Sequence, residues 1–179
     1  MRGRQRELVE EFKLAFRRHP AGVAIISAMG PQGPVGLTAS SVASVSLDPL
    51  ALSFSLAGTK SAQAILSAKT FVVHLMSAHD VDTVDAFARP GVPRFTAEQK
   101  WSTLPSGEPI LRTALAAMRC RHLHAIAVGD STLVVAEVLD VHRNPSSSPS
   151  LLYYNRGYRA VDDTTRVVPG ASSPPPASG

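Results

Sequence analysis

The stretch that decides the fold is GVAIISAMGPQGPVGLTASS, residues 22–41. Its first part, residues 22–28, contains β-branched residues and is typical of a buried strand. Residues 30–34, GPQGP, combine glycine and proline and predict a turn. The chain then returns through residues 35–41. The stretch therefore predicts a β-hairpin whose second strand ends in small, mostly polar residues.

A helix is predicted on the N-terminal side of this hairpin. Leu8, Phe12 and Phe16 recur at helical spacing between charged residues, which indicates an amphipathic helix over residues 5–17. Pro20 should end it, because the residue before a proline avoids the helical conformation.

More strands and short helices are predicted on the C-terminal side. Residues 50–56 alternate between large apolar and small side chains, as a strand with one core-facing side does. Further strands are expected at residues 71–76, 114–128, 131–142 and 151–154, and short helices at residues 61–68 and 81–88. Residues 89–109 are rich in proline and glycine and predict a long loop. Hairpins without alternating βαβ units indicate a mainly β (α+β) fold, best met by a closed or partly closed antiparallel barrel.

Composition limits the class of protein. The chain has 179 residues, 44% of them hydrophobic and 18% charged, which suits one ordered domain. Basic residues crowd the N-terminus but alternate with glutamates, which indicates a solvated helix face rather than a nucleic-acid-binding arm. No apolar run reaches the roughly 20 residues of a membrane span, and no signal peptide is visible. We therefore expect a cytoplasmic protein that binds neither nucleic acid nor membrane.

A metal site is not expected. The lone cysteine, Cys120, excludes an internal disulfide and a cysteine-rich metal centre. Cys120, His122 and His124 share one side of a predicted strand, but Cys120 and His124 would lie about 13 Å apart along it. That is too far for one ion with ligand bonds of about 2 Å. No nucleotide-binding glycine motif or nucleophile motif is present either, so the catalytic residues stay unknown.

Two clusters of small residues are the informative feature. One consists of Thr38, Ala39, Ser40 and Ser41, and the other runs from Ser55 to Ser61; each follows a predicted strand. Both offer backbone N–H groups and hydroxyls to a flat polar ligand. Lys60 adds a positive charge, and Ser61 begins a helix whose N-terminus could hold a phosphate. The same residues also suit turns and helix caps without any ligand.

Residues 16–26 and 36–50 together resemble the flavin reductase family, whose members are FMN-binding split barrels. Weaker similarities occur at residues 71–75, 107–111, 129–130 and 151–154, so the resemblance runs from about residue 12 to about residue 160. It implies an antiparallel split β-barrel with Greek-key-like connections and a few short peripheral helices. Residues 1–18 would be an amphipathic helix packing on the barrel, residues 19–161 the FMN-binding domain, and residues 162–179 a disordered tail rich in proline, serine and glycine.

The resemblance also implies roles for individual residues. Thr38, Ala39, Ser40 and Ser41 would line the isoalloxazine and ribityl chain, Lys60 and Ser61 would hold the FMN phosphate, and Ser55 would flank it. Asp130, Ser131 and Tyr154 would lie near the nicotinamide. Two positions depart from the family pattern, because Ser131 stands where a histidine is common and His74 replaces a common asparagine.

The implied activity is hydride transfer from C4 of NADH or NADPH to N5 of FMN, with FAD as an alternative flavin. The family implies a homodimer with the flavin near the subunit interface and a partner monooxygenase that receives the reduced flavin. Two alternatives stay open: a non-catalytic FMN-binding protein, such as an electron carrier or flavin store, and an interaction domain that has lost the ligand.

Overall fold

The structure, a computed structural model, describes residues 2–145, 147–162 and 164. The helices are α1 (Arg2–Arg17), α2 (Lys60–Ser67) and α3 (Val81–Ala88), with short 3-10 helices η1 (Ala78–Asp80) and η2 (Ala97–Gln99). The strands are β1 (Ala21–Gly22), β2 (Ala24–Gly30), β3 (Gly33–Ala39), β4 (Ala43–Leu47), β5 (Leu50–Ala57), β6 (Phe71–Leu75), β7 (Trp101–Thr103), β8 (Pro109–Leu111), β9 (Ala116–Val128), β10 (Ser131–Arg143), β11 (Ser150–Tyr154) and β12 (Gly157–Val161).

The strands form one large antiparallel sheet and two small ones. The large sheet has the order β3-β2-β6-β9-β10-β5-β4, and β1-β11-β12 and β7-β8 form the small sheets. All neighbouring pairs in the large sheet are antiparallel. The expectation of a mainly β, antiparallel fold with few helices is confirmed.

The predicted hairpin of residues 22–41 lies at the centre of this arrangement as β2 and β3. Gly30 pairs with Gly33, so the turn has two residues, and Gly33 has a φ of 119° that a larger side chain would rarely adopt. Successive side chains of β2 point to opposite faces, yet Ile25 and Ile26 are both fully buried. Strand β2 is therefore covered on both sides.

One core draws side chains from both ends of the strand order. Ala39 of β3 and Phe54 of β5 belong to the same buried cluster, and Ile65 of α2 completes it. Because β3 and β5 are far apart in the strand order, a shared core means that the sheet is strongly curled. On the other face of β2, Ile25 packs with Phe87 of α3 and with residues of β8 and β11.

The segment expected as a loop, residues 89–109, is more ordered than its proline and glycine content suggested. It contains η2 and β7, and it ends at Pro109, where β8 begins. Phe95 and Trp101 anchor it, since both pack against the core around Phe87. This aromatic contact is long-range in the sequence, so composition alone did not reveal it.

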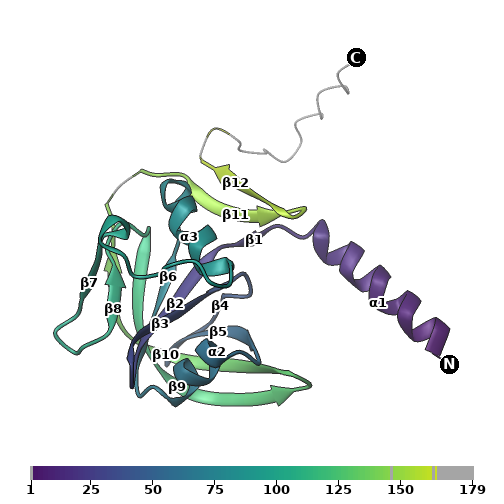
Figure 1. The fold of residues 1–179 in the computed structure, drawn as a ribbon, viewed down its shortest axis with the longest axis horizontal. Helices are drawn as coiled ribbons and strands as arrows, with labels where there is room; N and C mark the ends of the chain where they lie inside the picture. Colours follow the sequence, from purple (N-terminus) through teal and green to yellow (C-terminus); the bar gives the residue numbers. More distant parts are fainter. Residues whose placement is uncertain (1, 146, 163, 165–179) are drawn as a thin grey trace.

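The N-terminal helix covers the predicted residues and begins three residues earlier, at Arg2. Among the described residues, its apolar side does not pack on the large sheet. Figure 1 shows α1, in purple, extending away from the sheet. Leu8, Phe12 and Phe16 are 62%, 62% and 58% exposed. The expected tail falls mostly outside the described residues. None of the helices described is long and apolar enough to cross a membrane.

Candidate functional site

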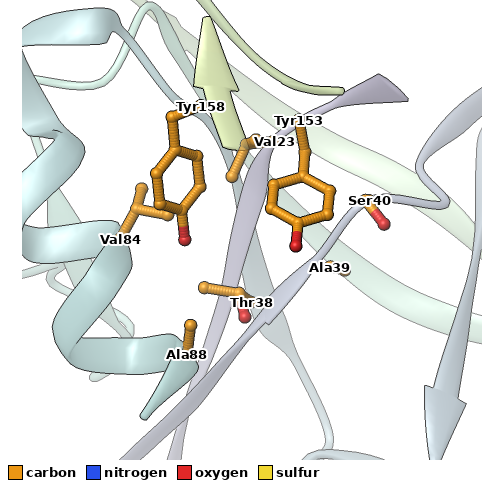
Figure 2. Close-up of a pocket in the computed structure, with 8 residues that line it drawn as sticks. All are labelled: Val23, Thr38, Ala39, Ser40, Val84, Ala88, Tyr153 and Tyr158. Atoms are coloured by element: carbon orange, nitrogen blue, oxygen red, sulfur yellow. The ribbon is translucent and has the colours of Figure 1, made fainter. Parts of the chain in front are cut away.

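A cleft opens where the end of β3 meets α3 and the β11–β12 hairpin (Figure 2). Its floor is the segment from Thr38 to Ser40, and Tyr153 and Tyr158 stand above it. Figure 2 shows the two tyrosine hydroxyls pointing toward this segment. The cleft measures about 190 Å³, less than the roughly 300–1,000 Å³ of most small-molecule sites. It is therefore part of a larger binding surface.

A second cavity, of about 370 Å³, continues this surface on the other side of Thr38. The last residues of β5, from Ser55 to Ala57, line it, together with Thr59 and Ser61 at the start of α2. Thr38 belongs to both cavities. The two predicted clusters of small residues thus meet in one place, as a joint binding site requires.

The start of α2 supplies hydrogen-bond donors to the second cavity. The hydroxyl of Thr59 caps the helix by accepting the N–H of Ala62 at 3.1 Å. The first-turn amides of Lys60 and Ser61 have no partner within the helix, and the helix dipole makes this end favourable for an anion. Ser61 lines the cavity, whereas Lys60 is exposed and does not. The predicted phosphate end is therefore built around Ser61 more than Lys60.

Arg94 provides the positive charge in this cavity, and sequence reasoning missed it. Its guanidinium donates to the carbonyls of Gly36 at 3.0 Å, Arg89 at 3.2 Å and Ala86 at 3.4 Å. It also lies 5.5 Å from the centre of the Phe87 ring. These bonds use three of its five N–H donors. The remaining donors are held in a fixed position on the cavity wall.

Ser41 joins the two clusters directly. Its Oγ accepts the N–H of Ser55 at 2.8 Å and the hydroxyl of Ser55 at 3.0 Å. This contact continues the antiparallel pairing of β4 and β5, in which Ala43 pairs with Ser53. Ser41 and Ser55 therefore shape the site by holding its two halves together.

The predicted nicotinamide residues lie around the site rather than inside these two cavities. Asp130 and Ser131 form the tip of the β9–β10 hairpin, where the Ser131 hydroxyl donates to Asp130 at 3.3 Å. The tip adjoins the exit of β5, since Ser131 pairs with Ala57. Neither residue lines the two cavities.

Tyr154 lines neither of these two cavities, whereas its neighbour Tyr153 lines the cleft. Successive strand residues face opposite sides of a sheet, so only one of the two can line the cleft. That residue is Tyr153, joined by Tyr158 from the paired strand. The two adjacent tyrosines in the sequence indicated an aromatic side chain near the site, but they did not show which of the two lines the cleft.

His74 lies in the core and not at the site. Its Nδ1–H donates to the Ile25 carbonyl at 3.0 Å, and its Nε2 accepts the Leu111 N–H at 3.1 Å. Burial lowers the pKa of His74 to about 4, although the Ile25 carbonyl and Asp80 act in the opposite direction. This departure from the family pattern is therefore a neutral, structural histidine.

Cys120 and the neighbouring histidine are also structural. The thiol is buried in the main core, and burial raises its pKa to about 12. His122 contacts the Phe71 ring and donates to the Ile65 carbonyl at 3.1 Å. Among the residues that the structure describes, no three potential metal ligands come together.

Comparison with known proteins gives a matching family and named relatives. Residues 16–162 match the flavin reductase like domain family. The chain is 40% identical over 152 residues to an NADH:FMN oxidoreductase of Rhodococcus qingshengii, covering 83% of this chain and 79% of that protein. It is 36% identical over 126 residues to the stachydrine N-demethylase reductase subunit Stc3 of Rhizobium meliloti, covering 69% and 54%.

Solved structures give the same result. The crystal structure of a flavin reductase domain protein from Arthrobacter sp. FB24 superposes with a TM-score of 0.79 at 31% identity. The match covers 85% of this chain and 94% of that one.

Proposed function

The chain belongs to the flavin reductase like domain family, and from this premise we propose that it is an NADH-dependent FMN reductase. The observation that carries the proposal is the position of Thr38, which forms a wall of both cavities. One cavity is bordered by strand backbone and aromatic rings, and the other by phosphate-binding groups. FMN has the same two parts, a flat ring and a phosphate.

The residues present fit FMN. The Ser61 hydroxyl, the first amides of α2 and the Arg94 guanidinium suit a phosphate dianion, because each is a donor or a positive charge. Thr38, Ala39 and Ser40 have small side chains that leave strand backbone accessible to a flat ring. When bound, FMN supplies the ring whose N5 accepts a hydride from C4 of the nicotinamide. The chain's own task is to hold the two rings in contact and exclude water.

We therefore propose that FMN is contacted directly by Thr38, Ala39, Ser40 and Ser61. Ser41 and Ser55 position the two halves, and Arg94 is added. Lys60 is proposed as a long-range positive charge. Asp130, Ser131 and Tyr154 stay predictions for the nicotinamide side. So do FAD and NADPH as alternative substrates, a cytoplasmic location and the three-segment division of the chain.

We propose a split barrel that works as a homodimer with the flavin near the interface. The buried core that Ala39 of β3 shares with Phe54 of β5 supports the barrel. A row of outward-facing side chains supports the dimer. Leu133 and Ile126 pair beside Ser55 and are 39% and 51% exposed. A second copy covering this row would also border the small cavities.

Reduced flavin from such a reductase would pass to a partner oxygenase. The similarity to a protein named as the reductase subunit of a demethylase supports this part of the proposal.

A steady-state assay with a blocked variant tests the function. We expect FMN-dependent oxidation of NADH by the purified protein, and loss of this activity in Thr38→Trp, whose indole would fill both cavities. Thr103→Trp, on the exposed part of β7, is the matched control and should keep full activity. Equal activity in both variants would place the flavin elsewhere, and FMN binding without turnover would favour the non-catalytic alternative.

A further inference from the structure

A third cavity lies beyond Ser40 and Ser41, and basic side chains form much of its wall. It measures about 400 Å³ and is lined by Arg17, His19 and Arg156. Ser40 and Tyr153 line both this cavity and the cleft in Figure 2. The three cavities therefore follow one another, in the order phosphate end, ring cleft and basic cavity.

The two arginines are held together by a specific backbone contact. The N–H of Asn155 donates to the Arg17 carbonyl at 3.0 Å, which ties the end of α1 to the β11–β12 turn. Asn155 and Arg156 have φ values of 47° and 63°, as a two-residue hairpin turn with a left-handed backbone requires. Glycine would adopt this backbone more easily than arginine. An arginine side chain is nevertheless presented at this point of the cavity.

The cavity keeps an excess of positive charge. No aspartate or glutamate lines it, and among the described residues neither Arg17 nor Arg156 forms an ion pair. Glu10 interacts electrostatically with both arginines, but it is already paired with Lys13 at 2.7 Å. Lys13 is the main cause of the lowered pKa of Glu10, and Arg17 and Arg156 contribute more weakly.

We propose that this basic cavity binds the diphosphate of the NADH substrate while the nicotinamide lies over the flavin cleft. The inference rests on the proposed function, because it needs a dinucleotide donor. Guanidinium groups bind phosphate oxygens through paired hydrogen bonds, so two arginines suit a group with two negative phosphates. The shared wall at Ser40 and Tyr153 places this site beside the ring cleft, where the other half of the donor must react.

Donors that share the nicotinamide but differ in phosphates test the assignment. The double variant Arg17→Gln/Arg156→Gln should raise the KM for NADH by about tenfold for each arginine–phosphate hydrogen bond that it removes. The value of kcat should change little. Reduced nicotinamide riboside carries the same reactive ring and no phosphate, so its KM should stay the same in both proteins. Arg6→Gln, on the same helix but outside this cavity, is the control and should behave as the wild type.

A binding measurement without turnover gives a second readout. Calorimetric titration with ADP-ribose should show affinity for the wild type and for Arg6→Gln, and a loss of about tenfold or more in the double variant. Equal ADP-ribose affinity in all three proteins would overturn the proposal. NADPH, assayed as a third donor, gives a further check. A rise in KM for NADPH alone would also overturn the proposal, because the arginines would then hold its 2′-phosphate. If the wild type oxidises neither donor, the proposed function fails, while the titration still decides whether the cavity binds a diphosphate.

Discussion

Single residues explain why the phosphate end of the site is selective. Arg94 is held by three backbone carbonyls and the Phe87 ring, so little entropy is lost when its remaining donors bind an anion. Lys60 is exposed and has no such support. An exposed charge of this kind contributes at most about 1 kcal/mol.

The variant Arg94→Gln should therefore distinguish binding of the FMN phosphate from binding of the flavin ring. We expect the dissociation constant for FMN to rise by about tenfold or more, and that for riboflavin, which has no phosphate, to stay the same. Lys60→Ala should raise the dissociation constant for FMN by less than about fivefold. Flavin fluorescence titration measures all of these. If Arg94→Gln lost affinity for FMN and for riboflavin equally, Arg94 would only support the fold.

His74 makes stability depend on pH. Its pKa is about 4 in the folded protein against 6.5 for an ordinary histidine. Between these values the unfolded chain binds a proton that the folded chain does not, so stability falls as the pH decreases through this window. The full loss is roughly 3 kcal/mol. Urea unfolding at several pH values should show this decline in the wild type, complete recovery above pH 6.5, and no decline from this source in His74→Asn.

Glu108 acts in a lower pH window and fixes the end of the 89–109 segment. Burial by itself raises its pKa, but hydrogen bonds from Ser106, Thr70 and Arg119 outweigh burial and hold the pKa at about 2. The carboxylate also pairs with Arg119 at 2.8 Å. Glu108→Gln should lower the free energy of unfolding at neutral pH by about 1–3 kcal/mol. The wild type should lose stability as the pH falls from 4.5 to about 2, because Glu108 becomes protonated there. Glu108→Gln should not show this contribution.

Among the elements, the contact between β3 and α3 sets the shape of the site. A Cβ on Gly36 would lie 2.6 Å from Cε1 of Phe87 and 3.1 Å from the Ile26 carbonyl. Gly36→Ala must therefore push α3 away from the strand that carries Thr38. We expect a stability loss of about 1–3 kcal/mol and weaker FMN binding. Gly22→Ala is the matched control, because nothing lies within 4 Å of its added Cβ.

Elements with a strong local pattern could be predicted from the sequence, and their distant contacts could not. The β2–β3 hairpin and the meeting of its end with the 55–61 cluster were predicted correctly. Arg94 was missed because it reaches the site only after Phe95 and Trp101 fold the 89–109 segment back onto Phe87. The sequence did not show which ring of the Tyr153–Tyr154 pair lines the cleft, because a shift of one residue reverses the face of a strand.

At the scale of the whole molecule, apolar surface is left uncovered by the residues that the structure describes. Helical periodicity identified the apolar side of α1 correctly, but it could not show what that side contacts. Phe12 and Phe16 pack on one another, with ring centres 4.7 Å apart, and stay exposed. Ile126 and Val128 of the long hairpin are 51% and 61% exposed. Two such surfaces on one chain favour assembly with a second copy.

Ile126→Asp should therefore give a monomer, because it places a charge in the row that borders Ser55. Light scattering after gel filtration measures the mass, and FMN affinity should fall with loss of the dimer. Met29→Asp, at an exposed apolar position near the β2–β3 turn, is the control and should leave the dimer intact. A wild-type protein that is monomeric at all concentrations would contradict the homodimer.

The most direct test of the central claim is to mix the protein and FMN with NADH in the absence of oxygen and follow the visible absorbance of the flavin. We expect rapid, protein-dependent bleaching of the flavin, matched by oxidation of an equal amount of NADH and abolished by Thr38→Trp. Flavin that binds the protein but bleaches no faster than in buffer would contradict it.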